Sequence, residues 1–287
     1  MRTRAVLALT LFLTATSGSA QDYETARQAY INGDYADALA VLEPLARAGD
    51  PEARNILADA YDDGNGVTRD HQRALELYRS AAAQGLAKAS YNLGVLLAEG
   101  RPGIPADIAQ AIVHYHEAMA KDYPAAFNNR GILHAKGQGG PVDPAAAVAL
   151  YQRAHTLGDL NGTDNLADML RRGDGVAKDE AAALALWRGA AERGHGPAMN
   201  NLGAMYANGI VVEQDAIAAQ ALYLLAAQTG SVQGGMNLSD LYAIKGDDLH
   251  ALAWCLWAVE RGSEAECGAK DDAMWPPARA LAARLTP

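Results

Sequence analysis

The histidines are the residues of this chain best suited to acid–base or metal chemistry, because imidazole titrates near neutral pH and binds metal ions. A nucleophilic mechanism would also need a Ser, Cys or Thr beside a histidine and a carboxylate to orient it. No Gly-x-Ser-x-Gly, Ser-x-x-Lys or His-Glu-x-x-His pattern occurs. On a helix, His114 and His116 would point in nearly opposite directions, so they would not share a metal ion. The histidines are His71, His114, His116, His134, His155, His195 and His250. We expect no catalytic residue, no metal site and no cofactor.

The segment Asp62-Asp63-Gly64-Asn65-Gly66 superficially resembles a calcium-binding loop. It lacks the alternating oxygen ligands and the closing bidentate glutamate of such loops. A glycine-rich end of a helix explains the segment better.

Cys255 and Cys267 are the two cysteines of the chain and lie twelve residues apart. An oxidising compartment would allow a disulfide between them, and an even count fits that interpretation. The alternative is two small buried thiols on neighbouring helices. Because sequence spacing does not determine the distance between two Cβ atoms, both alternatives stay open.

An asparagine recurs at a fixed place along the chain, at Asn92, Asn129, Asn165, Asn201 and Asn237. A side-chain amide both donates and accepts hydrogen bonds, so it can hold the backbone of an extended peptide. It can equally bridge two adjacent helices, which is the structural alternative. The candidate partner-binding residues are Asn55, Asn92, Asn128, Asn129, Asn165, Asn200, Asn201 and Asn237.

These asparagines belong to a repeat of about 36 residues, with units that begin at residues 49, 85, 122, 158, 194 and 230. A leucine follows each asparagine except Asn129, and small residues stand beside it, so one helical face can pack closely on a neighbour. Glycine ends each predicted first helix, and aspartate opens each second helix, where it can cap the orphan amides. The opening aspartates are Asp70, Asp107, Asp143, Asp179, Asp215 and Asp247.

The two ends of the repeat array depart from this pattern, as the ends of solenoids usually do. Residues 23–48 are predicted to form a shorter opening helix pair, and the unit from 230 has a short loop. A capping helix is expected over residues 274–285. Arg130 and His134 replace apolar residues in the unit from 122.

The small-x-x-x-Leu-Gly start, the Gly-x-Gly-Val loop and the Asp-x-x-x-Ala-x-x-x-Tyr/Trp second helix resemble the Sel-one-like repeat family of the tetratricopeptide-like superfamily. The resemblance covers nearly all of residues 21–287. It implies an all-α fold, a right-handed α/α solenoid of helix-turn-helix repeats. It also implies that the first helices line a concave groove, where the recurring asparagines could hold a peptide. Specificity would then come from Asn55, Asp59, Tyr91, Asn128, Asp164, Asp168, Asn200, Met236 and Asp240, whose acidic members favour a basic or neutral polar ligand.

Residues 1–20 are predicted to be a Sec-type signal peptide. Arg2 and Arg4 precede an apolar stretch, and small residues lead to cleavage after Ala20. A membrane anchor or a buried first helix is the alternative, but the stretch is short for a bilayer span, which needs about 20 apolar residues. We expect a periplasmic or secreted protein without stable membrane insertion after cleavage. The formal net charge of −10 and the absence of a Lys/Arg-rich run argue against nucleic-acid binding.

Together these features predict an exported, non-catalytic scaffold, adaptor or regulator that binds a protein or peptide on its concave helix face. Cysteine-rich members of the family suggest the alternative, a penicillin-binding or weak β-lactamase-type hydrolase. Those members carry a cysteine pair in most repeats, whereas this chain has two cysteines in total. Turnover of nitrocefin by the purified protein would distinguish the two functions.

Overall fold

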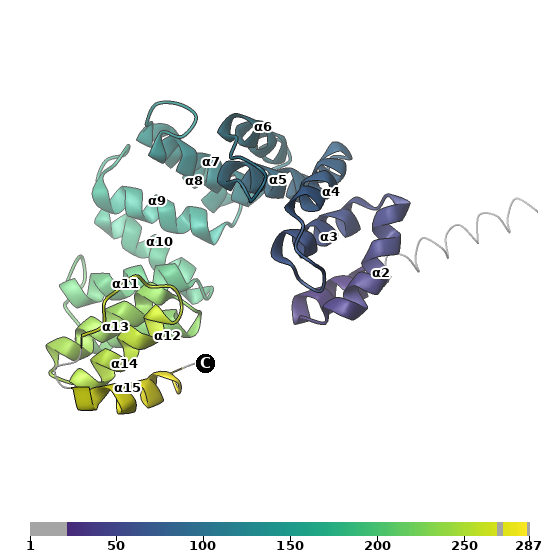
Figure 1. Ribbon diagram of the computed structural model, residues 1–287. Helices are drawn as coiled ribbons and strands as arrows, with labels where there is room; N and C mark the ends of the chain where they lie inside the picture. Colours follow the sequence, from purple (N-terminus) through teal and green to yellow (C-terminus); the bar gives the residue numbers. More distant parts are fainter. Residues whose placement is uncertain (1–21, 269–271, 286–287) are drawn as a thin grey trace, which may run out of the picture. The chain divides into compact units, whose positions relative to one another are not determined.

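A computed structural model describes residues 22–268 and 272–285 of the chain (Figure 1). The predicted signal peptide lies outside these ranges. Within them all regular elements are helices, and the β-type pairing is an isolated bridge between Arg101 and Ile104. The all-α solenoid fold that the family resemblance implied is confirmed.

The chain forms two compact units, with the boundary between Val142 and Asp143. The first unit starts with a helix over residues 22–32. Its other helices are α2 (Tyr35–Ala48), α3 (Pro51–Asp63), α4 (His71–Ala83), α5 (Ala87–Glu99), α6 (Ile108–Met119) and α7 (Pro124–Lys136). Successive helices pack on one another, from α2 on α3 to α6 on α7. Their core contains the fully buried Leu42, Leu93 and Leu96.

The second unit continues the same alternation of first and second helices. Its helices are α8 (Pro144–Thr156), α9 (Leu160–Arg172), α10 (Glu180–Glu192), α11 (Gly196–Asn208), α12 (Ala216–Gln228), α13 (Val232–Ile244), α14 (Asp248–Val259) and α15 (Trp275–Ala282), with a 3₁₀ turn over Asp272–Met274 before α15. Trp187 and Trp257 are its largest fully buried side chains.

The predicted aspartate caps are confirmed in both units. Each of the six aspartates directly precedes a second helix, and its carboxylate accepts a backbone N–H from the first turn of that helix. In α4, for example, Asp70 accepts from the amide of Arg73 at 3.0 Å. The carboxylate also lies at the positive end of the helix dipole, which stabilises the helix start further.

Residue 122 explains why glycine recurs at the start of the repeats. The glycines at 49, 85, 158, 194 and 230 all have positive φ, and Asp122, which replaces glycine in the third repeat, also has a positive φ of 53°. The left-handed conformation is accessible to glycine without a steric penalty, and aspartate is one of the few other residues that tolerate it.

Small residues in the first helices make room for the recurring aromatic residues of the second helices. A Cβ atom added to Gly94 in α5 would lie 2.7 Å from the ring of Tyr115 in α6. Gly203 in α11 faces Tyr223 in α12 at the same distance. In these two repeats, the predicted close approach of the helices therefore depends on a glycine opposite a tyrosine.

Cys255 and Cys267 are joined by a disulfide bond, with their Cα atoms 5.8 Å apart. Cys255 is a buried residue of α14, and Cys267 belongs to the segment that follows that helix. The bond ties this segment to the core around Trp254 and Trp257.

Candidate interaction surface

The first helices of the repeats carry the predicted partner-binding asparagines. These helices are α3, α5 and α7 in the first unit and α9, α11 and α13 in the second. We define a first-helix face by three sets of side chains. They are the side chains at the recurring asparagine positions, those directly before these positions, and those one helical turn after them.

In the first unit, the first-helix face holds a buried carboxylate. The hydroxyl of Tyr78 in α4 donates to Oδ1 of Asp59 in α3 at 2.5 Å, and Asn92 in α5 donates to the same oxygen at 3.1 Å. Burial raises the pKa of Asp59 from 3.8 to about 6, although the hydrogen bond from Tyr78 acts in the opposite direction. Burial and the neighbouring Asp59 also raise the pKa of Tyr78 far above its usual range. The hydroxyl of Tyr78 thus stays protonated and remains the donor.

Asn92 also donates to Oδ1 of Asn55 at 3.1 Å, and Asn55 is fully buried in α3. Among the described residues, no acceptor pairs with the amide nitrogen of Asn55. An orphaned buried donor costs free energy, so packing of the surrounding helices must compensate for it.

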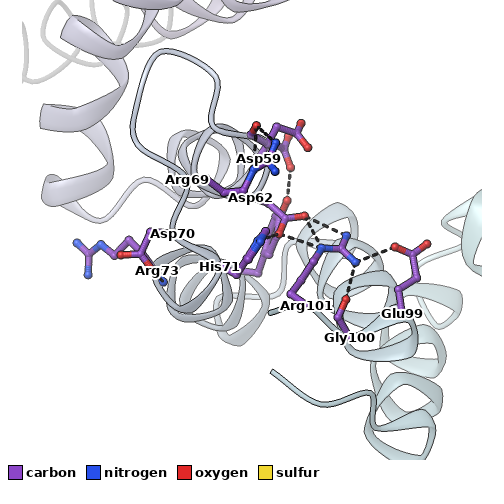
Figure 2. Close-up of polar contacts among 11 residues, drawn as sticks. Asp59, Asp62, Arg69, Asp70, His71, Arg73, Glu99, Gly100 and Arg101 are labelled. Atoms are coloured by element: carbon purple, nitrogen blue, oxygen red, sulfur yellow. Dashed lines mark hydrogen bonds and ion pairs between the residues drawn. The ribbon is translucent and has the colours of Figure 1, made fainter. Parts of the chain in front are cut away.

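A second carboxylate at the end of α3 links two repeats (Figure 2). Arg101, in the loop after α5, donates to both carboxylate oxygens of Asp62 at 3.0 to 3.2 Å. Nδ1 of His71, the first residue of α4, lies 2.8 Å from the same carboxylate. The Asp62 side chain is 12% exposed, and its oxygens are occupied by these two partners. The segment that resembles a calcium loop thus uses its Asp62 to hold Arg101.

The recurring asparagines form a ladder between successive first helices. Asn92 donates to Asn55 and Asn129 to the hydroxyl of Tyr91 in the first unit, at 3.1 and 3.4 Å. Asn201 donates to Asp164 and Asn237 to Asn200 in the second unit, both at 2.8 Å. In every case the acceptor stands at the position directly before the asparagine site of the preceding repeat.

In the second unit, Asp164 repeats the arrangement around a buried carboxylate. Its Oδ1 accepts from Nε1 of Trp187 in α10 and from Asn201 in α11, both at 2.8 Å. Burial raises the pKa of Asp164, while these two hydrogen bonds oppose the rise. An aromatic donor from the second helix and an asparagine from the next first helix therefore hold a buried aspartate in both units.

The structure leaves the predicted asparagines little freedom to contact a ligand. Asn55, Asn128 and Asn200 are buried, and Asn92, Asn129, Asn165, Asn201 and Asn237 are half-buried. Asn128 donates to its neighbour Asn129 at 3.2 Å. These contacts are the ones that the helix-bridging interpretation expects. A direct role of these asparagines in partner binding stays a prediction.

A groove opens on the first-helix face of the second unit. It has a volume of about 370 Å³ and lies between the C-terminal halves of α11 and α13, with Tyr223 of α12 among its walls. Leu241 and Ile244 contribute apolar surface, and the Ile244 side chain is among the most exposed large apolar residues described, at 87%. Of the predicted residues, Asn237 and Asp240 line the groove.

A neighbouring hollow of about 270 Å³ shares Asp240 with this groove. Asp248, Glu266 and the disulfide-bonded Cys255 and Cys267 also line it. The predicted residue Met236 belongs to this hollow. The first-helix face of the second unit thus combines exposed apolar side chains with carboxylates.

Sequence reasoning missed the contacts of Arg101 and Trp187. Arg101 is not repeated in other repeats, so the repeat pattern carries no signal for it. The recurring aromatic position did indicate Trp187, but only as a packing residue and not as a donor to Asp164.

Among the residues that the structure describes, no group of three or more His, Cys, Asp or Glu side chains could hold a metal ion. No helix in the same ranges is long and apolar enough to cross a membrane. Each unit offers, on its own helices, a surface with polar and apolar side chains.

The helices that carry these surfaces belong to a recognisable sequence repeat. The profile of the Sel1 repeat matches five segments, residues 51–86, 87–123, 124–159, 164–195 and 196–231. The chain belongs to the Sel1 repeat family. Sel1 repeat proteins typically mediate interactions between proteins. The matched segments contain α3 to α8, α9 from residue 164, and α10 to α12, and so the asparagine ladder from Asn55 to Asn201 lies in Sel1 repeats.

Solved structures share the Sel1 architecture. A Sel1 repeat protein from Oxalobacter formigenes is 30% identical, with a TM-score of 0.73 over 83% of this chain and 99% of that chain. A protective antigen present in uropathogenic Escherichia coli strains, displaying an SLR fold, is 27% identical, with a TM-score of 0.61 over 95% of this chain and 59% of that chain.

Sequence relatives match over shorter regions. The ERAD-associated E3 ubiquitin-protein ligase component HRD3A of Arabidopsis thaliana is 38% identical over 77 residues, which make up 27% of this chain. The chain spans only 11% of the length of HRD3A and 13% of that of its relative HRD3B. The similarity thus concerns the repeats and not those whole proteins.

Proposed function

We propose that this Sel1 repeat protein is an exported, non-catalytic interaction module that binds a protein or peptide partner through the first-helix face. The observation that carries the proposal is the groove between α11 and α13, where apolar Ile244 is 87% exposed beside Asp240. Large apolar side chains exposed in a groove with a polar rim are typical of interaction sites.

The chemistry of this groove selects for the partner. Leu241 and Ile244 favour an apolar side chain, while Asp240 and the nearby Asp248 and Glu266 favour a basic or neutral polar group beside it. The asparagine ladder holds the first helices at fixed spacing, so the surface is ordered before the partner arrives.

Export is supported by two features of the chain. Residues 1–20 have the positive start, apolar stretch and small residues of a signal peptide. The bond between Cys255 and Cys267 suits an oxidising compartment such as the periplasm, because cytosolic thiols are kept reduced.

Photo-crosslinking in intact cells tests the proposed surface. A photoreactive residue placed at Asp240 should capture a partner, and Ile244→Asp should reduce capture about tenfold, since it places a charge where an apolar side chain would be buried. Ile31→Asp is the matched control, because Ile31 is 60% exposed and lies in the other unit.

Equal capture by the two variants would refute the use of this groove. A parallel experiment with Asn129→Ala and Asn165→Ala tests the asparagines separately. Undiminished capture by those variants would assign the asparagines to helix bridging alone and leave the groove proposal intact.

A further inference from the structure

A second groove lies in the first unit between two second helices. It has a volume of about 320 Å³ and is bounded by the end of α2, the start of α3 and one side of α4. The lining residues of this groove, which we call the arginine groove, are Ala46, Arg47, Arg54, Leu57, Arg73, Glu76, Leu77 and Ser80. Three of them are arginines, although the whole chain has a formal net charge of −10.

Arg54 is held in place by neutral partners. Its Nε donates to the carbonyl oxygen of Ala46 at 2.9 Å, and its Nη1 donates to the hydroxyl of Ser80 at 2.7 Å. Neither partner neutralises the guanidinium. In the part of the chain that the structure describes, no carboxylate lies within the 4.0 Å of an ion pair with Arg54. A guanidinium has five N–H donors, and these two contacts leave others available.

Stacking of the repeats does not require a cation at this position. The equivalent residues of the later repeats are Ser90, Phe127, Thr163, Met199 and Gly235, and all of them are buried. Arg54 thus departs from a position that small or apolar residues otherwise fill. A half-buried charge without a carboxylate partner is costly unless something compensates for it.

Arg47 and Arg73 flank Arg54 at the edge of the groove. Their side chains are 75% and 51% exposed, and they pair with Glu43 at 4.0 Å and with Glu76 at 3.1 Å. Such exposed ion pairs contribute little free energy, so an incoming anion can compete with them. Below the arginines, the buried side chains of Ala46, Leu57 and Leu77 supply an apolar floor.

We propose that the arginine groove binds a carboxylate that stands next to an apolar side chain in a partner peptide. Arg54 donates to the carboxylate in the paired geometry that guanidinium groups favour. Arg47 and Arg73 add attraction, and the apolar floor receives the neighbouring side chain. The carboxylate comes from the C terminus of the peptide or from an internal acidic residue. This site is independent of the groove between α11 and α13.

Fluorescence polarisation with four labelled peptides distinguishes these sources. Fluorescein-Gly-Ser-Gly-Ser-Leu is used with a free C-terminal carboxylate and as the amide. Fluorescein-Gly-Glu-Leu-Gly-Ser-amide is compared with the same peptide containing Gln. We expect one carboxylate peptide to bind about tenfold or more tightly than its neutral counterpart, as hydrogen bonds to a charged group predict. The Nε–Hε signal of Arg54 in a ¹H–¹⁵N NMR spectrum should shift during the same titration.

Variants assign the binding to the arginines. Arg54→Gln should weaken binding about tenfold or more, and Arg54→Lys, which keeps the charge without the paired donors, should weaken it less. Because Arg54 also joins α2 to α4, the double variant Arg47→Gln/Arg73→Gln tests the groove without loss of those contacts and should weaken binding severalfold. Arg79→Gln is the matched control on α4, since Arg79 is exposed and does not line the groove.

Three results would overturn the proposal. They are equal binding of the carboxylate and neutral peptides, equal loss of binding in Arg79→Gln and Arg54→Gln, and displacement of every peptide by equimolar inorganic phosphate. Sedimentation velocity provides a fourth test. The contradicting result is a wild type that binds no peptide but self-associates, with the self-association abolished by Arg54→Gln. That result would identify a second copy of the chain as the occupant and contradict the peptide proposal.

Discussion

Asp59 and Asp164 are charged groups placed where water cannot solvate them well. Each is compensated by an aromatic donor and an asparagine, Tyr78 and Asn92 for Asp59, and Trp187 and Asn201 for Asp164. These donors favour the ionised carboxylate, but burial outweighs them and raises both pKa values. The same residues therefore join the repeats and make their stability depend on pH.

The pH dependence predicted for Asp59 has a definite sign. Its pKa rises from 3.8 to about 6 on folding, so between those values the folded state binds a proton that the unfolded state has lost. Stability from this group is therefore fully present below about pH 4, falls between pH 4 and pH 6, and is lost above about pH 6. Asp59→Asn removes this titration.

Urea unfolding of the wild type and of Asp59→Asn at pH 4.5 and 7.5 measures the effect. Relative to the variant, the wild type should lose on the order of 2 kcal/mol of unfolding free energy between the two pH values. Asp63→Asn, a change at an exposed neighbour on α3, is the control. A difference between wild type and Asp59→Asn that stays constant with pH would contradict the prediction.

At the scale of elements, the helix pairs are joined by close contacts between small and aromatic residues. Gly203 of α11 lies against the ring of Tyr223, and Gly94 of α5 lies against Tyr115. Gly189 of α10 is a helical glycine of another kind, because a Cβ atom there would meet nothing within 4 Å. The two types of glycine predict opposite responses to alanine.

Gly203→Ala should destabilise the second unit by about 1 to 3 kcal/mol, because the added methyl group overlaps the Tyr223 ring. Gly189→Ala should stabilise it by about 0.5 to 1 kcal/mol, since alanine favours an exposed helix interior over glycine. Thermal or urea unfolding of the two variants gives both numbers. Destabilisation of similar size in both would mean that the Tyr223 contact is not the cause.

At the scale of the whole molecule, the disulfide acts on one unit of the chain. It connects residues separated by 12 positions and holds the segment after α14 to that helix. Cross-linking a loop of this size stabilises a fold by about 3 kcal/mol in the chain-entropy description. The two units should therefore respond differently to reduction.

Hydrogen exchange with and without dithiothreitol tests this difference. Protection of the α14 amides should fall on reduction, while protection of α3 to α6 in the first unit should stay the same. The double variant Cys255→Ala/Cys267→Ala should reproduce the reduced state without the reductant. Unchanged protection of α14 in both cases would show that the bond contributes nothing to the stability of the second unit.

The proposed export is also tested at the scale of the whole chain. Full-length protein produced in a Gram-negative host should be found in the periplasm, shortened at its start and with Cys255 and Cys267 resistant to alkylation. A chain that starts at Gln21, produced with only an initiating methionine, should stay in the cytoplasm with alkylatable thiols. Mass spectrometry of the two fractions measures both properties, and cytoplasmic retention of the full-length protein would contradict the proposed export.

The sequence by itself determined the helices, their ends and the repeat. Asp70 caps α4 and Gly64 ends α3 through contacts within a few residues, so local spacing contains the necessary information. Recurrence over about 36 residues then identified the family, because each repeat presents the same packing problem.

The tertiary structure alone decided what the polar residues contact. The bond from Asn92 to Asn55 joins residues 37 positions apart, and the bond from Arg101 to Asp62 joins residues 39 apart. The arginine groove likewise needs α2, α3 and α4 together.

The spacing of repeats predicts that asparagines recur, but only the register between stacked helices determines whether an amide faces a ligand or the helix beside it. The register places the hydrogen bonds donated by the side chains of Asn92, Asn129, Asn201 and Asn237 between helices, because a half-buried amide group is most stable where another polar group satisfies it.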